Sequence, residues 1–419
     1  MDKIAYIWGF TDTFLLQPRQ ATMIPSTTDA LMRPLPIRWL PMLMLTVGMI
    51  LTSALYGQDE PIPALRYQQM IGTGFATSWF KTEPPETSEL PDGHLMQTMV
   101  DLRKAGFSNL RLRARADIYG FADIITDTGA EPAQYLDKAA MERFLTELER
   151  VVTIANNHGI TPILSWLHHE AESRASTQDG ENYVAWWSVV AEYFRDFPPT
   201  LGFNLMTEIG IQGFGGLRVD PSLSNEWMRH AMAAIRSTGG NNATRNLILT
   251  SPLKTEKGLT KLESDLFNGK HILAEWHRYA SGPNQRGGNK DWHGDGSPEE
   301  RRILLDAVAT ARQFQQSRGI PTWLGAWMPW DNANASLDQQ EINAFATFFT
   351  TTLASQQIPW SMNELHAVYS IKDNQWRKWV RTGREHSLVI NMEDVMAAIE
   401  KGRKKGENVP SKDVSAIRE

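Results

Sequence analysis

Short apolar segments alternate with longer amphipathic segments from Arg66 onward, and this alternation is the feature that most constrains the fold. Strands that take turns with helices are typical of parallel α/β sheets and barrels. One such helix is expected after Asp137 and ends at Gly159, a residue type suited to the end of a helix. The 419 residues suffice for one large barrel or two ordinary domains.

The segment F-N-L-M-T-E-I-G, residues 203–210, places a single carboxylate, Glu208, at the end of an apolar run. Side chains alternate along a strand, so Asn204 and Glu208 are expected on one face and Thr207 on the other. A glycine-rich loop follows. Catalytic groups of (β/α)8 barrels lie at the C-terminal ends of strands, beside such loops. We therefore predict a single-domain (β/α)8 (TIM) barrel with Glu208 in its site.

Composition excludes several classes of function. The net charge of −6, from 42 basic and 48 acidic residues, gives no basic face and disfavours nucleic acid as a partner. The absence of cysteine excludes disulfides, thiolate metal sites and cysteine nucleophiles. Fifteen tryptophans are many for this length, and exposed rings near strand ends would suit the apolar faces of sugars.

An apolar block at residues 39–57, preceded by Arg33 and Arg38, has the pattern of a signal peptide. Residues 1–57 are thus expected to be a leader with cleavage after Gly57. Its residues 1–31 are either an unusually long n-region or precede a true start at Met23 or Met32. The block is also about long enough to span a bilayer, so an uncleaved membrane anchor is the alternative. Either outcome places the rest of the chain outside the cytoplasm, as a secreted, periplasmic or membrane-anchored protein.

The remaining chain divides into a catalytic domain and a tail. The domain is expected over residues 58–400. Residues 401–419 are rich in charge and predict a solvated, partly mobile C-terminal tail.

Polar side chains follow several expected strands. Arg111 and Arg113 share one strand face, and an arginine inside a barrel is costly unless it is paired, so Arg111 is expected to meet a carboxylate. In A-E-W-H-R-Y, alternation puts Glu275, His277 and Tyr279 on a single face, which indicates a site.

Two adjacent histidines, His168 and His169, end another expected strand. Neighbours on a strand face opposite ways, and the H-E-x-x-H spacing of a zinc helix is missing. Hydrogen bonding to substrate or to a carboxylate is therefore favoured over metal binding. We expect neither a metal nor a cofactor.

Taken together, the strand endings resemble glycoside hydrolase family 5, the cellulase-like retaining glycosidases, over about Tyr67 to Trp376. The resemblance implies a polysaccharide or oligosaccharide substrate and a general acid/base at Glu208, in M-T-E-I. The other motifs are G-F-S-N-L-R, L-H-H, H-R-Y and the tryptophan of the last strand. The resemblance implies that the following residues contact substrate: Arg111, His168, His169, Thr207, His277, Tyr279, Trp327 and Trp360.

Two positions depart from the family pattern. Thr207 stands where the family has an asparagine that binds the sugar 2-hydroxyl, and Ala326 stands where it has the nucleophilic glutamate. A methyl group cannot attack an anomeric carbon. Retaining hydrolysis needs a second carboxylate about 5–5.5 Å from the first, and inversion needs one about 6.5–9.5 Å away.

Three carboxylates are candidates for the missing role: Glu275, Glu364 after the last strand, and Asp331 in the loop after Ala326. We favour Glu275 because its strand phase is best supported. Glu208 would remain the proton donor, with a pKa raised by the apolar mouth of the barrel.

Two other functions stay open. Loss of the nucleophile predicts a protein that binds oligosaccharide on a hydrolase scaffold without cleaving it. A lyase acting on acidic polysaccharide would use Tyr279 or His277 as base and Arg111 to hold a uronate.

Overall fold

The computed structural model describes residues 60–409 except 125–132, 137, 208, 210–215, 281–290, 331–335 and 383–387. The expected leader, residues 1–57, lies outside this range, as do Glu208 and Asp331. Across the described ranges, no helix combines the length and the apolar character that a bilayer crossing requires.

Eight parallel strands close into a barrel, in which β1 pairs with both β2 and β10. This confirms the predicted (β/α)8 architecture. In ring order the strands are β1 (Thr73–Phe80), β2 (Asn109–Arg115), β5 (Thr161–Leu167), β6 (Gly202–Asn204), β7 (Leu247–Thr250), β8 (Ile272–Tyr279), β9 (Thr322–Met328) and β10 (Trp360–Met362).

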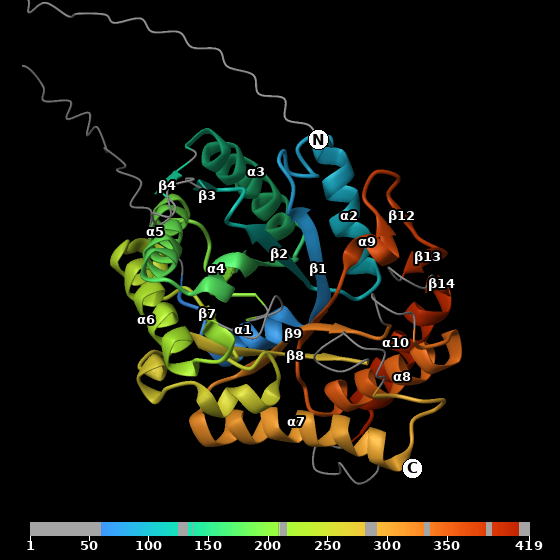
Figure 1. Cartoon of the computed structure of the whole chain (residues 1–419). Helices are drawn as coiled ribbons and strands as arrows, with labels where there is room; N and C mark the ends of the chain where they lie inside the picture. Colours follow the sequence, from blue (N-terminus) through green and yellow to red (C-terminus); the bar gives the residue numbers. More distant parts are fainter. Residues whose placement is uncertain are drawn as a thin grey trace, which may run out of the picture. The chain divides into compact units, whose positions relative to one another are not determined.

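Helices surround the strands, as Figure 1 shows. The long ones are α2 (Asp92–Lys104), α3 (Lys138–Asn157), α5 (Thr177–Tyr193), α6 (Pro221–Ser237), α7 (Pro298–Arg318), α8 (Gln339–Ser355) and α10 (Met392–Glu407). Shorter helices are α1 (Ala64–Ile71), α4 (His169–Arg174), α9 (Leu365–Val368) and the 3-10 turns Gly216–Arg218, Gly240–Ala243, Glu256–Lys261 and Ser264–Phe267.

Three two-stranded antiparallel sheets stand apart from the barrel. They are β3 (Phe121–Ile124) with β4 (Ala133–Leu136), β11 (Tyr369–Ser370) with β12 (Gln375–Trp376), and β13 (Trp379–Thr382) with β14 (Leu388–Asn391).

The core has two layers. A large cluster fills the space between strands and helices, and a small one fills the barrel interior near the N-terminal ends of the strands. The small cluster joins Tyr67 and Ile71 of α1 to Ile163, Leu273 and Trp323 of the strands. Helix α1 therefore closes one end of the barrel, which leaves the other end for a site.

Two boundaries differ from expectation. The segment M-I-G-T-G-F predicts a first strand over Met70–Phe75, but α1 runs to Ile71 and β1 begins at Thr73, since the buried residues before the strand repeat with helical spacing. The expected tail from residue 401 begins inside α10, which continues to Glu407 against α8; residues 410–419 lie outside the described range.

Candidate active site

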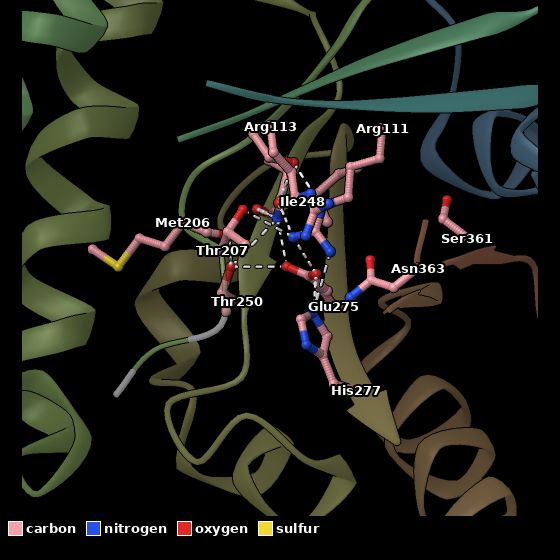
Figure 2. Close-up of polar contacts among 12 residues, drawn as sticks. Arg111, Arg113, Met206, Thr207, Ile248, Thr250, Glu275, His277, Ser361 and Asn363 are labelled. Carbon is pink, nitrogen blue, oxygen red and sulfur yellow. Dashed lines mark hydrogen bonds and ion pairs between the residues drawn. The ribbon is translucent and has the colours of Figure 1, made fainter. Parts of the chain in front are cut away.

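An ion pair between Arg111 of β2 and Glu275 of β8 lies inside the barrel (Figure 2). The Nη2–Oε1 distance is 2.6 Å, and both side chains have 0% exposure. This confirms that the barrel-facing arginine meets a carboxylate. It also shows that this carboxylate is enclosed by protein.

Both oxygens of Glu275 have further partners. Asn204 donates to Oε2 through Nδ2 at 2.7 Å, and the hydroxyl of Thr250 donates to the same oxygen at 3.1 Å. The Nε2 atom of His277 contacts Oε1. The carboxylate is thus held by groups from four strands, β2, β6, β7 and β8.

The guanidinium of Arg111 is equally well bound. It donates to Ser165 Oγ at 2.9 Å, to Asn204 Oδ1 at 2.8 Å and to Thr207 Oγ1 at 3.1 Å. The Cζ atom of Arg111 also lies 5.1 Å from the ring centre of Trp323. This set of hydrogen bonds fixes the arginine at the centre of the barrel.

The electrostatics follow from these contacts. Burial alone raises the pKa of the Glu275 carboxyl, but Arg111 and His277, with the hydrogen bond from Asn204, hold it below its usual value. Glu275 is therefore ionised at neutral pH. A group with this pKa is a weak base, because an efficient base has a pKa near the working pH.

The strand phase expected around Thr207 is wrong. Thr207 bonds to Arg111 on the same side as Asn204, although alternation placed the two on opposite faces. The reason is that β6 ends at Asn204, so period-two alternation no longer applies to the residues that follow. Glu208 itself lies outside the described residues.

A bulge interrupts β9 at Gly325-Ala326. One step along β8 matches two steps along β9 here, because Trp276 pairs with Leu324 and His277 pairs with Ala326. The pairing with β10 shifts at the same place. A side chain at Gly325 would collide with the carboxylate of Glu275, so a glycine makes room for that glutamate.

A second glutamate, Glu364, follows β10 at the mouth of the barrel. Arg113 of β2 pairs with its Oε1, Lys81 Nζ lies 3.3 Å from the same oxygen, and His366 Nδ1 lies 3.1 Å from Oε2. Burial alone raises the pKa of Glu364, but the Arg113 guanidinium, the hydrogen bond with His366 and the Lys81 ammonium hold it well below the usual range. Unlike Glu275, its side chain is 17% exposed.

Tyr279, at the end of β8, is tied to the same rim. Asn363 Nδ2 donates to the Tyr279 hydroxyl at 3.1 Å, and Lys254 Nζ lies 4.9 Å from the centre of the tyrosine ring. Figure 2 draws the Asn363 side chain turned toward Glu275 and His277. Tyr279 and Asn363 therefore bridge from β8 to β10 across the bulge in β9.

The two adjacent histidines lie past the end of β5. His168 is the N-cap of α4, and its Nδ1 accepts from Ala171 N at 3.4 Å. His169 is the first residue of α4, with Nδ1 3.4 Å from Glu172 Oε2. Within the described part of the chain, no three His, Cys, Asp or Glu side chains gather as a metal site would require.

The two tryptophans expected to contact substrate lie in the core. Trp327 has 0% exposure and packs against Phe349 of α8, with ring centres 5.7 Å apart. Trp360 packs against Trp327 at 5.2 Å and against Phe107 at 6.2 Å. These contacts place both rings on the helix side of the barrel wall.

Five further polar residues belong to the site: Lys81, Ser165, Asn204, Thr250 and Asn363. They are single residues at or near strand ends, and of these only Asn204 falls in a segment that the sequence marked, residues 203–210. Strand parity could have placed Ser165 inward, two residues after the buried Ile163, but no residue type marked it as functional.

A closed parallel barrel with charged and polar groups at the C-terminal ends of its strands has the form of an enzyme of the TIM-barrel class. A family model described as cellulase (glycosyl hydrolase family 5) matches residues 67–366. Because the match spans well over half of the chain, the protein belongs to glycosyl hydrolase family 5, and the resemblance in the motifs is confirmed.

The curated relatives that match this chain are named as endoglucanases. Endoglucanase A of Clostridium longisporum is 22% identical over 232 residues, which are 52% of this chain and 43% of that protein. Endoglucanase B of Clostridium cellulovorans is 26% identical over 225 residues, 50% of this chain and 45% of that protein. The chain thus spans less than half of the length of these relatives.

Solved structures show the same fold. The endoglucanase Cel5A of the hyperthermophilic Thermotoga maritima has a TM-score of 0.61 and 19% identity, over 81% of this chain and 100% of that one. A broad-specificity GH5-4 endoglucanase from Clostridium longisporum has a TM-score of 0.62 and 15% identity, over 82% and 99% of the two chains. At these identities the likeness establishes the architecture alone.

Proposed function

We propose that this protein is a glycosidase that cleaves O-glycosidic bonds in a polysaccharide or oligosaccharide outside the cytoplasm, with Glu208 as the general acid. One observation carries the proposal. In a chain of glycosyl hydrolase family 5, Arg111, Thr207 and His277 converge on a single polar network inside the barrel. The leader pattern supports export, either as a free or as an anchored protein.

The substrate would lie across the C-terminal end of the barrel. Arg111 and Glu275 form the floor, and Tyr279, Glu364 and Lys81 stand at the rim. The floor is fixed and charged, so it can orient the residues above it and strengthen the electrostatic field at the reacting bond. His168 and His169 belong to the same end, through β5 and α4.

The second carboxylate is proposed by elimination. Glu275 is enclosed, with both oxygens bonded, and both oxygens of Glu364 already have partners in Arg113, Lys81 and His366. Asp331 is the remaining candidate, three residues after the end of β9, the strand that carries Ala326. We assign it the second carboxylate, activating water in an inverting reaction.

Product analysis on a panel of soluble β-glucans, mannans and uronic polymers tests the proposal. We expect chain shortening without unsaturated ends, and loss of turnover by about a thousandfold or more in Glu208→Gln and in Asp331→Asn. Full turnover in Asp331→Asn would refute the assignment to that residue. Unsaturated products would refute hydrolysis and favour the lyase.

A second candidate function rests on Ala326. If the panel shows binding but no cleavage by the natural sequence, the protein binds oligosaccharide without hydrolysing it. An Ala326→Glu variant decides between these outcomes, because a gained activity would show that the lost carboxylate is the only missing part.

A further inference from the structure

Five polar residues line one side of the barrel mouth, and we refer to them as the polar shelf: Lys81, Arg113, Asn363, Glu364 and His366. They come from β2 and from the residues that follow β1 and β10, and these three strands are neighbours in the ring. In an eight-stranded ring, β10 stands opposite β6, the strand that leads to Glu208. A ligand that lies across the mouth from the end of β6 would therefore reach the polar shelf.

Burial within the polar shelf is graded from inside to outside. The side chain of Arg113 is 4% exposed and that of Lys81 26%, with Glu364 between them. Arg113 also donates to the carbonyl oxygen of Thr77 at 3.1 Å, which ties it to β1. Arg113 thus fixes Glu364 from within, while Lys81 remains accessible from the mouth.

An acceptor in the polar shelf has no donor from the protein. The Nδ2 group of Asn363 is bonded to Tyr279, but its Oδ1 is buried and has no hydrogen-bond partner in the structure. A buried carbonyl oxygen without a donor is costly, by about 1–3 kcal/mol, and such atoms are rare in native proteins. Asn363 thus keeps the capacity to accept one further hydrogen bond within the polar shelf.

We propose that the polar shelf is a hydroxyl-recognition subsite and that Lys81 determines its specificity. Adjacent hydroxyls of a sugar ring can each donate and accept a hydrogen bond. Lys81 and Glu364, 3.3 Å apart, offer one donor and one acceptor side by side. Lys81 donates to one hydroxyl and Glu364 accepts from the next.

This inference rests on the proposed function, since it assumes a carbohydrate ligand. It specifies which feature of that ligand the protein recognises, namely the configuration of its hydroxyls. An ammonium and a carboxylate side by side distinguish the configuration of neighbouring hydroxyls, because inverting one hydroxyl removes its hydrogen bond. The subsite therefore selects between sugars that differ at a single ring carbon.

The test measures binding of β-1,4-linked glucose and mannose tetramers by calorimetry for Lys81→Met and for wild type, each carrying Glu208→Gln so that the tetramers are not cleaved. Methionine keeps the packing of the lysine stem and removes its charge. We expect Lys81→Met to lose about tenfold in affinity for the preferred tetramer and to reduce the preference between the two tetramers to about twofold or less. Lys372→Met, at an exposed lysine outside the barrel, is the matched control and should change neither value.

The outcomes separate this inference from the proposed function. If wild type binds a tetramer and Lys81→Met keeps the same affinity and preference, the subsite assignment is overturned and the glycosidase proposal survives. If wild type binds neither tetramer and cleaves no member of the polysaccharide panel, both fail together. Equal weakening toward both tetramers, with the preference unchanged, would reduce Lys81 to a structural role and also overturn the assignment.

Discussion

Two arginines of the same strand, Arg111 and Arg113, each bind a glutamate, and the two pairs differ in how far water reaches them. Arg111 and Glu275 are both fully enclosed. Arg113 is nearly enclosed, but its partner Glu364 is 17% exposed and shares its charge with Lys81 and His366. The inner pair has no surface left for a ligand, whereas the outer pair has.

The difference shows how the same ion pair serves two purposes at two depths. Desolvated charges lose their hydration and depend on each other, so breaking one partner is strongly destabilising. Charges near the surface keep part of their hydration and contribute little to stability. We therefore assign the inner pair to the integrity of the barrel and the outer pair to recognition.

The largest effect is expected for Glu275→Gln. The variant leaves Arg111 buried without a counter-charge, which should lower the free energy of unfolding by about 3–5 kcal/mol. Chemical denaturation monitored by tryptophan fluorescence measures it. Glu393→Gln, at a glutamate 62% exposed and 3.9 Å from Lys378, should stay within about 0.5 kcal/mol of wild type. A loss under 1 kcal/mol for Glu275→Gln would show that the inner pair is not structural.

The next largest effect is expected for Gly325→Ala. The new methyl group would occupy the place of the Glu275 carboxylate and push it away from Arg111. We expect a loss of about 1–3 kcal/mol in unfolding free energy, as in other overpacked cores. Gly93→Ala is the matched control, because open space surrounds a methyl group at that position in α2. Equal stability of the two variants would contradict the close fit of glycine and glutamate.

Much of the fold was predictable from the sequence because its signals are local. The amphipathic segment 138–157 and the capping box of Ser297 and Glu300 needed only helical period and cap chemistry. The strand phase of Glu275 and His277 was also predictable, since β8 is long enough for alternation to hold.

The parts of the site that escaped prediction depend on contacts between distant segments. Thr207 faces Arg111 because β6 stops at Asn204, and nothing local in F-N-L-M-T-E fixes that end. Trp360 packs in the wall because Phe107 and Trp327 surround it there. Asn363 acquired its place from a tyrosine 84 residues away in the chain.

A smaller effect is expected in the acid dependence of stability. The pKa values of Glu275 and Glu364 are lowered in the folded state, so their stabilisation is present above the unfolded glutamate value, about 4.3, and is lost as pH falls through the lower folded values. Each group contributes a slope of at most about 1.4 kcal/mol per pH unit.

Urea titrations at a series of pH values below 5 measure this slope. Glu364→Gln should have a shallower decline than wild type, because it removes one carboxyl that must take up a proton. Parallel curves for the two proteins would show that the cations around Glu364 do not lower its pKa.

The smallest effect on stability is expected for Glu364→Gln at neutral pH, about 1 kcal/mol, because water solvates part of this cluster and glutamine can still accept from Arg113. Ligand binding, in contrast to stability, should depend more on Glu364 than on Glu275. In tetramer calorimetry on folded protein that carries Glu208→Gln to prevent cleavage, Glu364→Gln should lose about tenfold in affinity, since it removes the charged acceptor of the polar shelf. Two results would contradict this assignment of roles: wild-type affinity in Glu364→Gln, or a loss of stability as large as in Glu275→Gln. Either would show that the inner pair does not serve stability, and the outer pair recognition, because of their different depths in the barrel.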